Sequence, residues 1–426
     1  MKNARRVWVL ATLVLFNSGP AWPADEPKLQ RELTLKEAVE EALKKNPEIQ
    51  AARMKLAAGN ARSKQAPYLE DPEIALQAGG VPFSTPTNLN RADTNMIGIR
   101  QKLPFYGKLG LKEKIAQQEA KVLEHELHAK EREIIARVKM AYGDLFMAQK
   151  AIEISLEQSE IMRSISRASE ARYQVGKVSQ QDVFKALLEQ TAIMNQLAAA
   201  EHERHSAEIR LNASMNRPVQ APIQLPAELF PADNDLREPA LEELALANRA
   251  ELKGAEQEIE RSERMYELAE RNRKFPDFMV GWDYWYMPME MTKNRYAAMV
   301  NVSIPFSPWT AGRRNYEVEE SLAEIRAARA NREAIRNMTL REVGESLARA
   351  QAARRSLELY REGIVPQAGL SFRTALSAYQ AGRVEFISLL ESQRVLREAR
   401  MGYFKSLVSL MQNVADLERA VGKELQ

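Results

Sequence analysis

Two parts of the chain, about 200 residues apart, carry the same short motifs in the same order. A segment that begins with asparagine occurs near the start of each copy, at residues 46–52 and 248–255. An aliphatic residue followed by Pro-Phe occurs at 103–105 and 304–306, and a Tyr-Gln-x-Gly motif at 173–176 and 379–382. Solenoid repeats return every 20 to 50 residues or so, and this much longer period indicates a duplicated domain. The sequence therefore predicts two copies of one unit, residues 25–217 and 240–426, joined by a proline-rich linker at 218–239.

Each copy is predicted to contain a pair of long helices. Aromatic residues make up only 7% of the chain, which is typical of helices rather than of a β-sandwich. Apolar residues in steps of four and three form a coiled-coil stripe at Ile134, Val138, Ala141, Leu145, Ala148 and Ile152, and again at Leu340, Val343, Leu347 and Ala350. Residues 108–173 would extend about 100 Å as one helix. Because glycine readily takes the left-handed conformation that ends a helix, Gly176 and Gly382 are predicted at the tips of two helical hairpins.

A shorter helical region precedes the long helices, at residues 35–64 and at 241–273. The first is interrupted at Asn46-Pro47, because proline fits only the start of a new helix. Two segments with the alternation of β-strands follow in each copy, at residues 74–78 and 97–102, and at 278–286 and 300–304. An apolar face opposite a polar face is typical of a strand between lipid and a water-filled lumen, although a half-buried strand of a soluble sheet has the same pattern.

Four strands in one chain have a consequence for assembly. They cannot close a barrel, and a bilayer does not tolerate open sheet edges. Two chains would supply eight strands, whose interior side chains fill, whereas three chains would supply twelve and leave a channel. We therefore expect a mainly α protein of mixed α and β structure that must form oligomers if its strands span a membrane.

The first 24 residues are predicted to be a signal peptide. They combine basic residues at positions 2, 5 and 6, an apolar run at residues 7–16, and small residues before cleavage after Ala21 or Ala24. The apolar run has about ten residues, and a spanning helix needs about 20. We therefore expect an exported protein whose signal is removed.

Several kinds of chemistry are excluded or left without support. The chain has no cysteine, which excludes disulfides, a thiol nucleophile and a lipid anchor on a mature N-terminal cysteine. The net charge of +3 is small, and acidic residues match the basic ones along the same helices, so nothing indicates nucleic-acid binding. No catalytic triad, phosphate-binding loop or metalloprotease motif is present. We expect neither an enzyme nor a bound cofactor.

Two groups of residues have side chains that can bind metals. The histidines form the pairs His125/His128 and His202/His205, which the folded hairpin would separate by about 35 Å, so we interpret them as surface residues. Met287, Met289 and Met291 lie in the connection between the last two strands, where thioethers could bind soft ions. A loop on the outer face of a duct is a poor place for a selective site, and we predict no resident metal.

The sequence resembles the TolC-type outer-membrane efflux proteins from about Leu33 to Gly422. The resemblance rests on the duplication, on the strand-to-helix junctions at 103–105 and 304–306, and on the two Tyr-Gln-x-Gly tips. The resemblance implies a homotrimer with a twelve-stranded β-barrel in the outer membrane and an α-helical barrel across the periplasm. It also implies a periplasmic adaptor protein that contacts the hairpin tips, and an inner-membrane pump. The tip residues here are Tyr173, Gly176, Lys177 and Gly382.

The resemblance also implies a pore constriction and a tip latch, meaning a contact that holds the tip shut. The constriction candidates are Glu391 and Ser388, of which only Glu391 is acidic, and the latch candidates are Asp182, Tyr379 and Arg383. A basic latch residue would stand at Val384, one position beyond Arg383. Three copies of Glu391 around a narrow axis would attract cations and repel anions.

These expectations combine into a passive exit duct of a tripartite efflux system, driven through the adaptor by the inner-membrane pump. Short methionine-rich loops resemble those of heavy-metal efflux members, which favours metal ions or small toxic compounds as cargo. Two alternatives are the outer-membrane duct of a type I protein secretion system and a periplasmic coiled-coil scaffold without a pore.

Overall fold

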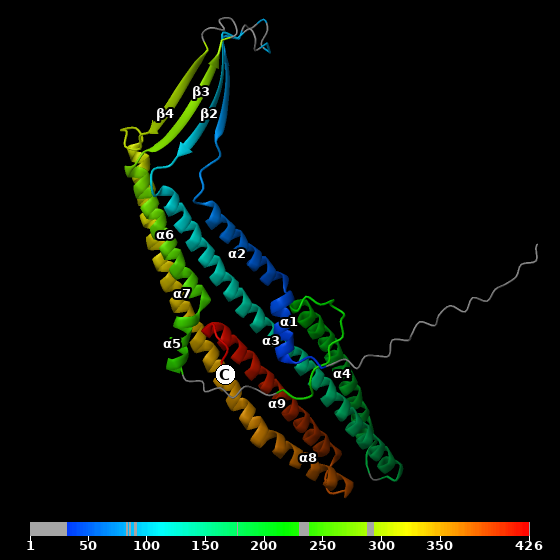
Figure 1. Ribbon diagram of the computed structural model, residues 1–426. Helices are drawn as coiled ribbons and strands as arrows, with labels where there is room; N and C mark the ends of the chain where they lie inside the picture. The colour runs from blue at the N-terminus through cyan, green and yellow to red at the C-terminus, as the bar shows by residue number, and fades with distance from the viewer. Residues whose placement is uncertain are drawn as a thin grey trace, which may run out of the picture.

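The computed structural model describes residues 32–81, 84, 87–88, 92–176, 178–229, 238–287 and 294–425. The predicted signal peptide, residues 230–237 of the predicted linker, Lys177, Met289 and Met291 lie outside the described residues. The described chain is elongated, with long helices side by side and a β-sheet beyond one end of them (Figure 1). The hairpin tips lie at the end opposite the sheet.

The same order of elements occurs in both halves: two helices, two strands, a long helix and a returning helix. The first half contains α1 (Leu35–Lys45), α2 (Pro47–Gln65), β1 (Glu73–Gly79), β2 (Thr94–Leu103), α3 (Lys108–Gln174) and α4 (Gln180–Ser214). The second half contains α5 (Glu238–Asn248), α6 (Ala250–Lys274), β3 (Asp277–Tyr286), β4 (Arg295–Ser303), α7 (Ala311–Leu359), α8 (Val365–Gln380) and α9 (Phe386–Val421). Within the described part of the chain, no helix combines the length and the apolar character needed to cross a membrane.

The predicted helices and strands are confirmed at these positions. The helix α3 runs for 67 residues without a break, and each strand contains or overlaps one of the four alternating segments. The sequence did not reveal the π-helical turn at Tyr360–Ile364, which separates α7 from α8. Pro366, in the first turn of α8, lacks an N–H group and its ring would clash with a carbonyl one turn earlier in a regular helix. The wider turn accommodates the proline without ending the helix.

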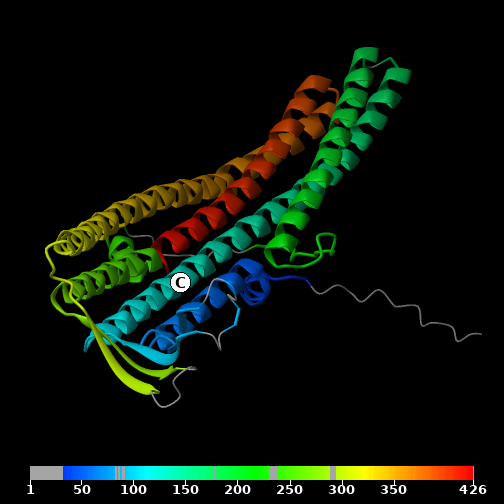
Figure 2. The same ribbon diagram turned by 90° about the horizontal axis from the view of Figure 1, so that it is seen from above.

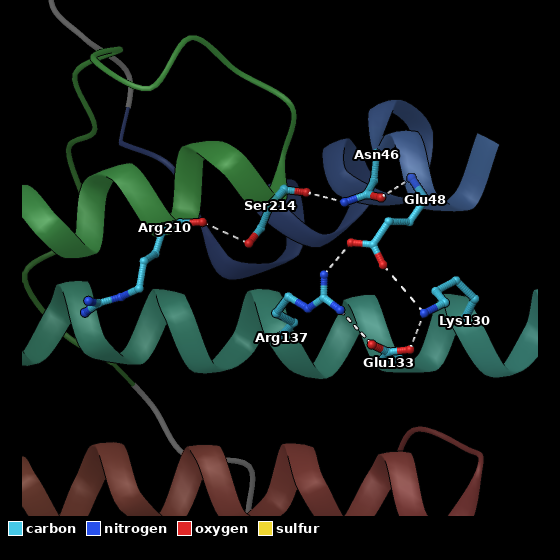
Figure 3. Close-up of polar contacts among 7 residues, drawn as sticks. All are labelled: Asn46, Glu48, Lys130, Glu133, Arg137, Arg210 and Ser214. Atoms are coloured by element: carbon cyan, nitrogen blue, oxygen red, sulfur yellow. Dashed lines mark hydrogen bonds and ion pairs between the residues drawn. The ribbon is translucent and has the colours of Figure 1, made fainter. Parts of the chain in front are cut away.

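Asn46 joins two helix ends in the first half (Figure 3). Its Oδ1 accepts a hydrogen bond of 2.8 Å from the Glu48 N–H and caps α2, while its Nδ2 donates a bond of 2.9 Å to the Ser214 carbonyl at the end of α4. Glu48 forms ion pairs with Lys130 and Arg137 of α3. As a result, α2 and α4 meet end to end while both pack against α3.

Arg249 makes the corresponding joint in the second half. It precedes α6, is only 2% exposed, and donates hydrogen bonds of 3.0 Å each to the carbonyls of Arg419 and Ala420 at the end of α9. It also forms an ion pair of 3.0 Å with Glu342 of α7. Arginine has no acceptor atom, so unlike Asn46 it gives its helix no side-chain cap.

The helices bury the predicted coiled-coil stripe between them. Ile134, Val138 and Leu145 of α3 are fully buried, as is Val343 of α7, whereas Ile152 is half-buried. Removing such an aliphatic side chain from water contributes about 1.5 to 3 kcal/mol of stability. The stripe therefore holds α3 against α4 and α9 along the rod.

The four strands form one antiparallel sheet in the order β1-β2-β3-β4 (Figure 1). Ile99 of β2 lies opposite Ile74 of β1 on one side and Trp282 of β3 on the other, so all three share a face. Their exposed fractions are 49%, 72% and 46%. The other face carries Arg100 and Asp283, whose charged groups lie 4.0 Å apart. The sheet therefore has an exposed apolar face and a polar face.

Candidate functional site at the hairpin tips

The two helical hairpins, α3 with α4 and α8 with α9, end near one another at the end of the molecule away from the sheet (Figure 2). Gly176 follows α3 with φ of +67°, and Gly382 follows α8 with φ of +74°. Each glycine N–H donates 2.9 Å to the carbonyl three residues earlier, Tyr173 and Tyr379 respectively. The predicted helix ends at these two glycines are confirmed.

The hairpins of one chain contact each other through Arg172 and Tyr379. The Arg172 Nη1 donates 2.6 Å to the Tyr379 carbonyl at the end of α8, and the guanidinium lies 4.8 Å from the centre of the Tyr379 ring. The Tyr379 hydroxyl lies 3.0 Å from Ser169 Oγ in a buried contact. Tyr379 is only 3% exposed and packs edge-on against Phe386 of α9. An arginine of α3 therefore donates an additional hydrogen bond to a carbonyl at the end of α8, which is favourable at the negative end of a helix dipole.

A buried ion pair joins α4 to α9 further from the tip. The carboxylate of Glu189, with a side chain only 5% exposed, pairs with Arg394 and, at 3.3 Å, with Arg397. Burial alone would raise the pKa of Glu189, but the hydrogen bonds and charges of the two arginines outweigh burial and lower it below its ordinary value. Glu189 is therefore ionised at neutral pH and links the two hairpins.

Two glutamines form a buried polar contact between α3 and α9. Gln393 Nε2 donates to Gln158 Oε1, and both residues are fully buried. Gln158 Nε2 and Gln393 Oε1 have no hydrogen-bond partner among the described residues. A buried amide with half its capacity unused contributes less stability than an apolar pair of the same shape, so this level of the rod is held less firmly than the aliphatic stripe.

The two constriction candidates share an exposed face of α9. Ser388 and Glu391 are three residues apart and both are exposed, and the exposed Val395 continues the same face. The opposite face of α9 is buried against the rest of the chain. Glu391 therefore projects away from its own chain, where a carboxylate can meet solvent or another copy.

The latch candidates are not joined to one another in this structure. Asp182 accepts from the Ser179 N–H at 3.3 Å and, together with Ser179, forms the capping box of α4. Tyr379 contacts Ser169 and Arg172 instead. Arg383 is exposed, and its N–H donates 2.9 Å to the Ala378 carbonyl. The contact between the two hairpins at this level is made by Arg172 and Ser169 of α3 with Tyr379 of α8.

Comparison with known proteins identifies the family. The sequence matches the family described as outer membrane efflux protein over residues 38–217 and 241–423. The chain belongs to this family. The resemblance seen in the repeated motifs is thereby confirmed.

Relatives and solved structures are similar over nearly the whole chain. The cobalt-zinc-cadmium resistance protein CzcC of Cupriavidus metallidurans is 23% identical over 393 residues, which are 92% of this chain and 90% of that protein. The outer-membrane channel OprN has a TM-score of 0.77 at 18% identity, covering 91% of this chain and 89% of its own. CusC has a TM-score of 0.76 at 16% identity, with coverage of 92% and 93%. VceC of Vibrio cholerae, an outer membrane protein, has a TM-score of 0.76 at 17% identity, with coverage of 92% and 97%. The mainly helical fold with its four-stranded sheet is that of the three solved structures.

The residues with metal-binding side chains lie apart from the tips. His125 and His128 are on α3, and His202 and His205 are on α4. His128 and His205 pair with nearby glutamates at 3.3 and 3.9 Å. Among the described residues, no three side chains of histidine, cysteine, aspartate or glutamate are grouped as a metal site. Met287 directly follows β3, and its N–H donates 3.3 Å to Asn294 Oδ1.

The sequence interpretation missed the residues that join the hairpins, above all Arg172 and Glu189. A signal for Glu189 exists: it lies between Ala186 and Ile193, at the spacing of the buried face of α4. A carboxylate on an apolar face requires a buried partner. Arg172 has no such signal, because its partner is a backbone carbonyl that only the folded chain brings near.

Proposed function

We propose that three copies of this chain form the outer-membrane exit duct of a tripartite efflux system. The observation that carries the proposal is the sheet. Its edge strands β1 and β4 each pair with one neighbour among the described strands, and its apolar face is exposed. In a bilayer every backbone hydrogen-bonding group needs a partner, so the edges must join those of other copies. Three copies supply twelve strands, enough to enclose a channel.

The helical part supports the same assembly. Large apolar residues on the exposed face of α4 include Phe184 at 60%, Leu187 at 47% and Met194 at 61% exposure. They recur at helical spacing, so they form a stripe, and exposed stripes of this size are typical of interaction surfaces. We propose that a neighbouring copy covers this stripe. The 67 residues of α3 then give the helical barrel a length of about 100 Å across the periplasm.

The hairpin tips are the proposed contact with the periplasmic adaptor. Tyr173 is 44% exposed, and it lies with Gly176 and Gly382 at the end of the rod farthest from the sheet. Lys177, which follows Gly176 in the sequence, is a further candidate for this contact. The duct itself is a passive conduit without enzymatic activity or cofactor, and the inner-membrane pump supplies the energy through the adaptor.

We propose Glu391, with Ser388, as the narrowest part of the entrance. Their exposed face of α9 supports this placement, since three copies around an axis would form a ring of carboxylates. Asp182, Tyr379 and Arg383 remain candidates for a latch in a closed state. To reach Asp182, Tyr379 would have to leave Arg172 and Ser169, so Arg172 would oppose that state.

Metal ions or small toxic compounds are the proposed cargo. The similarity to a cobalt-zinc-cadmium resistance protein along 92% of the chain supports this class. The alternatives are a duct for type I protein secretion and a pore-less periplasmic scaffold. Deletion and complemented strains can be compared in two assays that separate the cargo classes. One assay measures tolerance to cobalt, zinc, cadmium, copper and dyes, and the other measures secretion of polypeptides. Loss of polypeptide secretion alone would contradict the efflux proposal.

The assembly is tested by locating and sizing the protein. Processing at Ala21 or Ala24 is read from the mass of the mature protein, and membrane fractionation followed by sizing in detergent gives its location and stoichiometry. The duct proposal expects a trimer in the outer membrane. A water-soluble monomer or dimer in the periplasm would overturn it and favour the scaffold.

A further inference from the structure

A pocket of about 460 Å³ lies between α2, α3 and α6, beside the end of α9. Its charged lining consists of Arg53 from α2, Glu131 and Arg132 from α3, and Lys253 from α6. Three cationic side chains therefore face one carboxylate, although they come from three different helices.

The carboxylate of Glu131 already contacts two basic side chains. Arg53 Nη2 lies 3.4 Å from one of its oxygens, and His128 Nδ1 lies 3.3 Å from the other. The side chains of Arg132 and Lys253, by contrast, form no hydrogen bond or ion pair with any described residue, and both residues are only partly exposed. Two positive charges therefore line the pocket without a partner, at a cost that a bound anion would offset.

Other titratable groups near the pocket do not cancel this charge. Burial lowers the pKa of His125, which also lines the pocket, so its ring is neutral at pH 7. Glu124 is exposed, Glu256 pairs with Arg332 at 3.1 Å, and Glu251 pairs with Arg249 at 2.9 Å. The nearby acids are therefore solvated or bound elsewhere.

The two halves of the chain differ at this place. In the first half, Asn46 caps α2. In the second half, Arg249 gives α6 no cap, and Ala250, the first residue of α6, lines the pocket. The uncapped helix end adds partial positive charge to that of Arg132 and Lys253.

We propose that this pocket binds a small multivalent oxyanion, with phosphate or carboxylate groups, through Arg132 and Lys253. Side chains from two helices and one helix end surround the space, so an anion with several oxygens can contact all of them at once. The inference concerns this chain's own surface and is independent of the cargo and of the exit-duct proposal.

The test uses the full mature protein in detergent and isothermal titration with two probes, inorganic pyrophosphate and a tetraglutamate peptide, at constant ionic strength. Pyrophosphate represents a phosphate source and the peptide a carboxylate source. We expect at least one probe to bind, and Arg132→Gln or Lys253→Gln to weaken its affinity about tenfold or more. Arg132→Lys, which keeps the charge, should retain most of the affinity.

Matched controls separate the pocket from overall charge. Lys64 and Arg326 are exposed and form no ion pair with a described residue, so Lys64→Gln and Arg326→Gln remove the same charges elsewhere and should leave binding unchanged. Size and thermal unfolding of each variant establish that it is folded. The proposal is overturned if neither probe binds the wild-type protein, or if the Arg132 and Lys253 variants bind as the wild type does.

Discussion

Replacing Glu189 with glutamine should loosen the contact between the two hairpins of a chain. The substitution keeps the shape but removes the charge that pairs with Arg394 and Arg397. Each charge-assisted hydrogen bond contributes about 1.5 to 3 kcal/mol. Arg394 is 46% exposed and regains water when unpaired, whereas Arg397 is only 15% exposed and does not. After discounting the exposed partner, the loss is about 2 kcal/mol, or about a thirtyfold shift toward separated hairpins.

Hydrogen exchange of the assembled protein measures this shift directly. Backbone amides of α9 near Glu391 should exchange about thirtyfold faster in the variant, while those near Leu417, which is fully buried at the far end of α9, should be unchanged. If the duct proposal is correct, conductance in planar bilayers should rise as well, because the tips separate more often.

The matched control is Glu160→Gln. Glu160 pairs with Arg163 on the same helix at 2.7 Å, but both side chains are largely exposed. Its removal should cost less than about 0.5 kcal/mol and leave exchange in α9 unaltered. Equal exchange rates in wild type and the Glu189 variant would refute the reasoning, because they would mean that the ion pair contributes nothing to the docking of the hairpins.

Three further expectations concern other parts of the chain. Hydrogen bonds from Arg217 and, to a lesser extent, from Lys45 lower the pKa of Glu41 to about 2, so these contacts stabilise the fold by about 3 kcal/mol above pH 4.5. That contribution is lost as pH falls from 4.5 toward 2, and Arg217→Gln should remove most of this acid dependence in unfolding curves followed by circular dichroism. Gly382→Ala should destabilise the tip by about 1 kcal/mol, since φ is +74°, and an unchanged exchange rate at the tip would contradict this. Trp282→Lys should reduce the yield of heat-stable outer-membrane oligomer on gels, since a lysine facing lipid costs about 2 to 4 kcal/mol. Met279→Lys, on the other face of the sheet, should leave the yield unchanged. Equal yields of the two variants would contradict the proposed orientation of the sheet.

Periodicity accounts for the elements that the sequence predicted well. The steps of four and three around Ile134 and Val138 require a helix with one buried stripe, whatever the stripe packs against. Alternation around Trp282 likewise requires a strand with unlike faces. These patterns act over a few residues, and the repeated motifs additionally indicate the order in which helices and strands follow along the chain.

Contacts between distant segments were not predictable in the same way. The π-helical turn before Pro366 depends on the helix continuing past the proline, which packing against α9 decides. The position of Tyr379 beside Arg172 depends on how two hairpins dock, although these residues are separated by more than 200 positions in the chain. The latch with Asp182 stays a prediction, and in this structure Tyr379 contacts Arg172 and Ser169.

The sequence by itself determined that this protein consists of long helices ending at Gly176 and Gly382 and of four strands with an apolar face, because turn-forming glycines and side-chain periodicity act over a few residues. Only the tertiary structure decided which charges pair. Asn46 and Arg249 occupy corresponding joints, yet one caps its helix and the other binds the carbonyls of α9 and leaves an uncapped helix end beside Lys253. An ion pair or a hydrogen bond depends on a few ångströms between side chains, and that separation is set by the packing of helices from both halves.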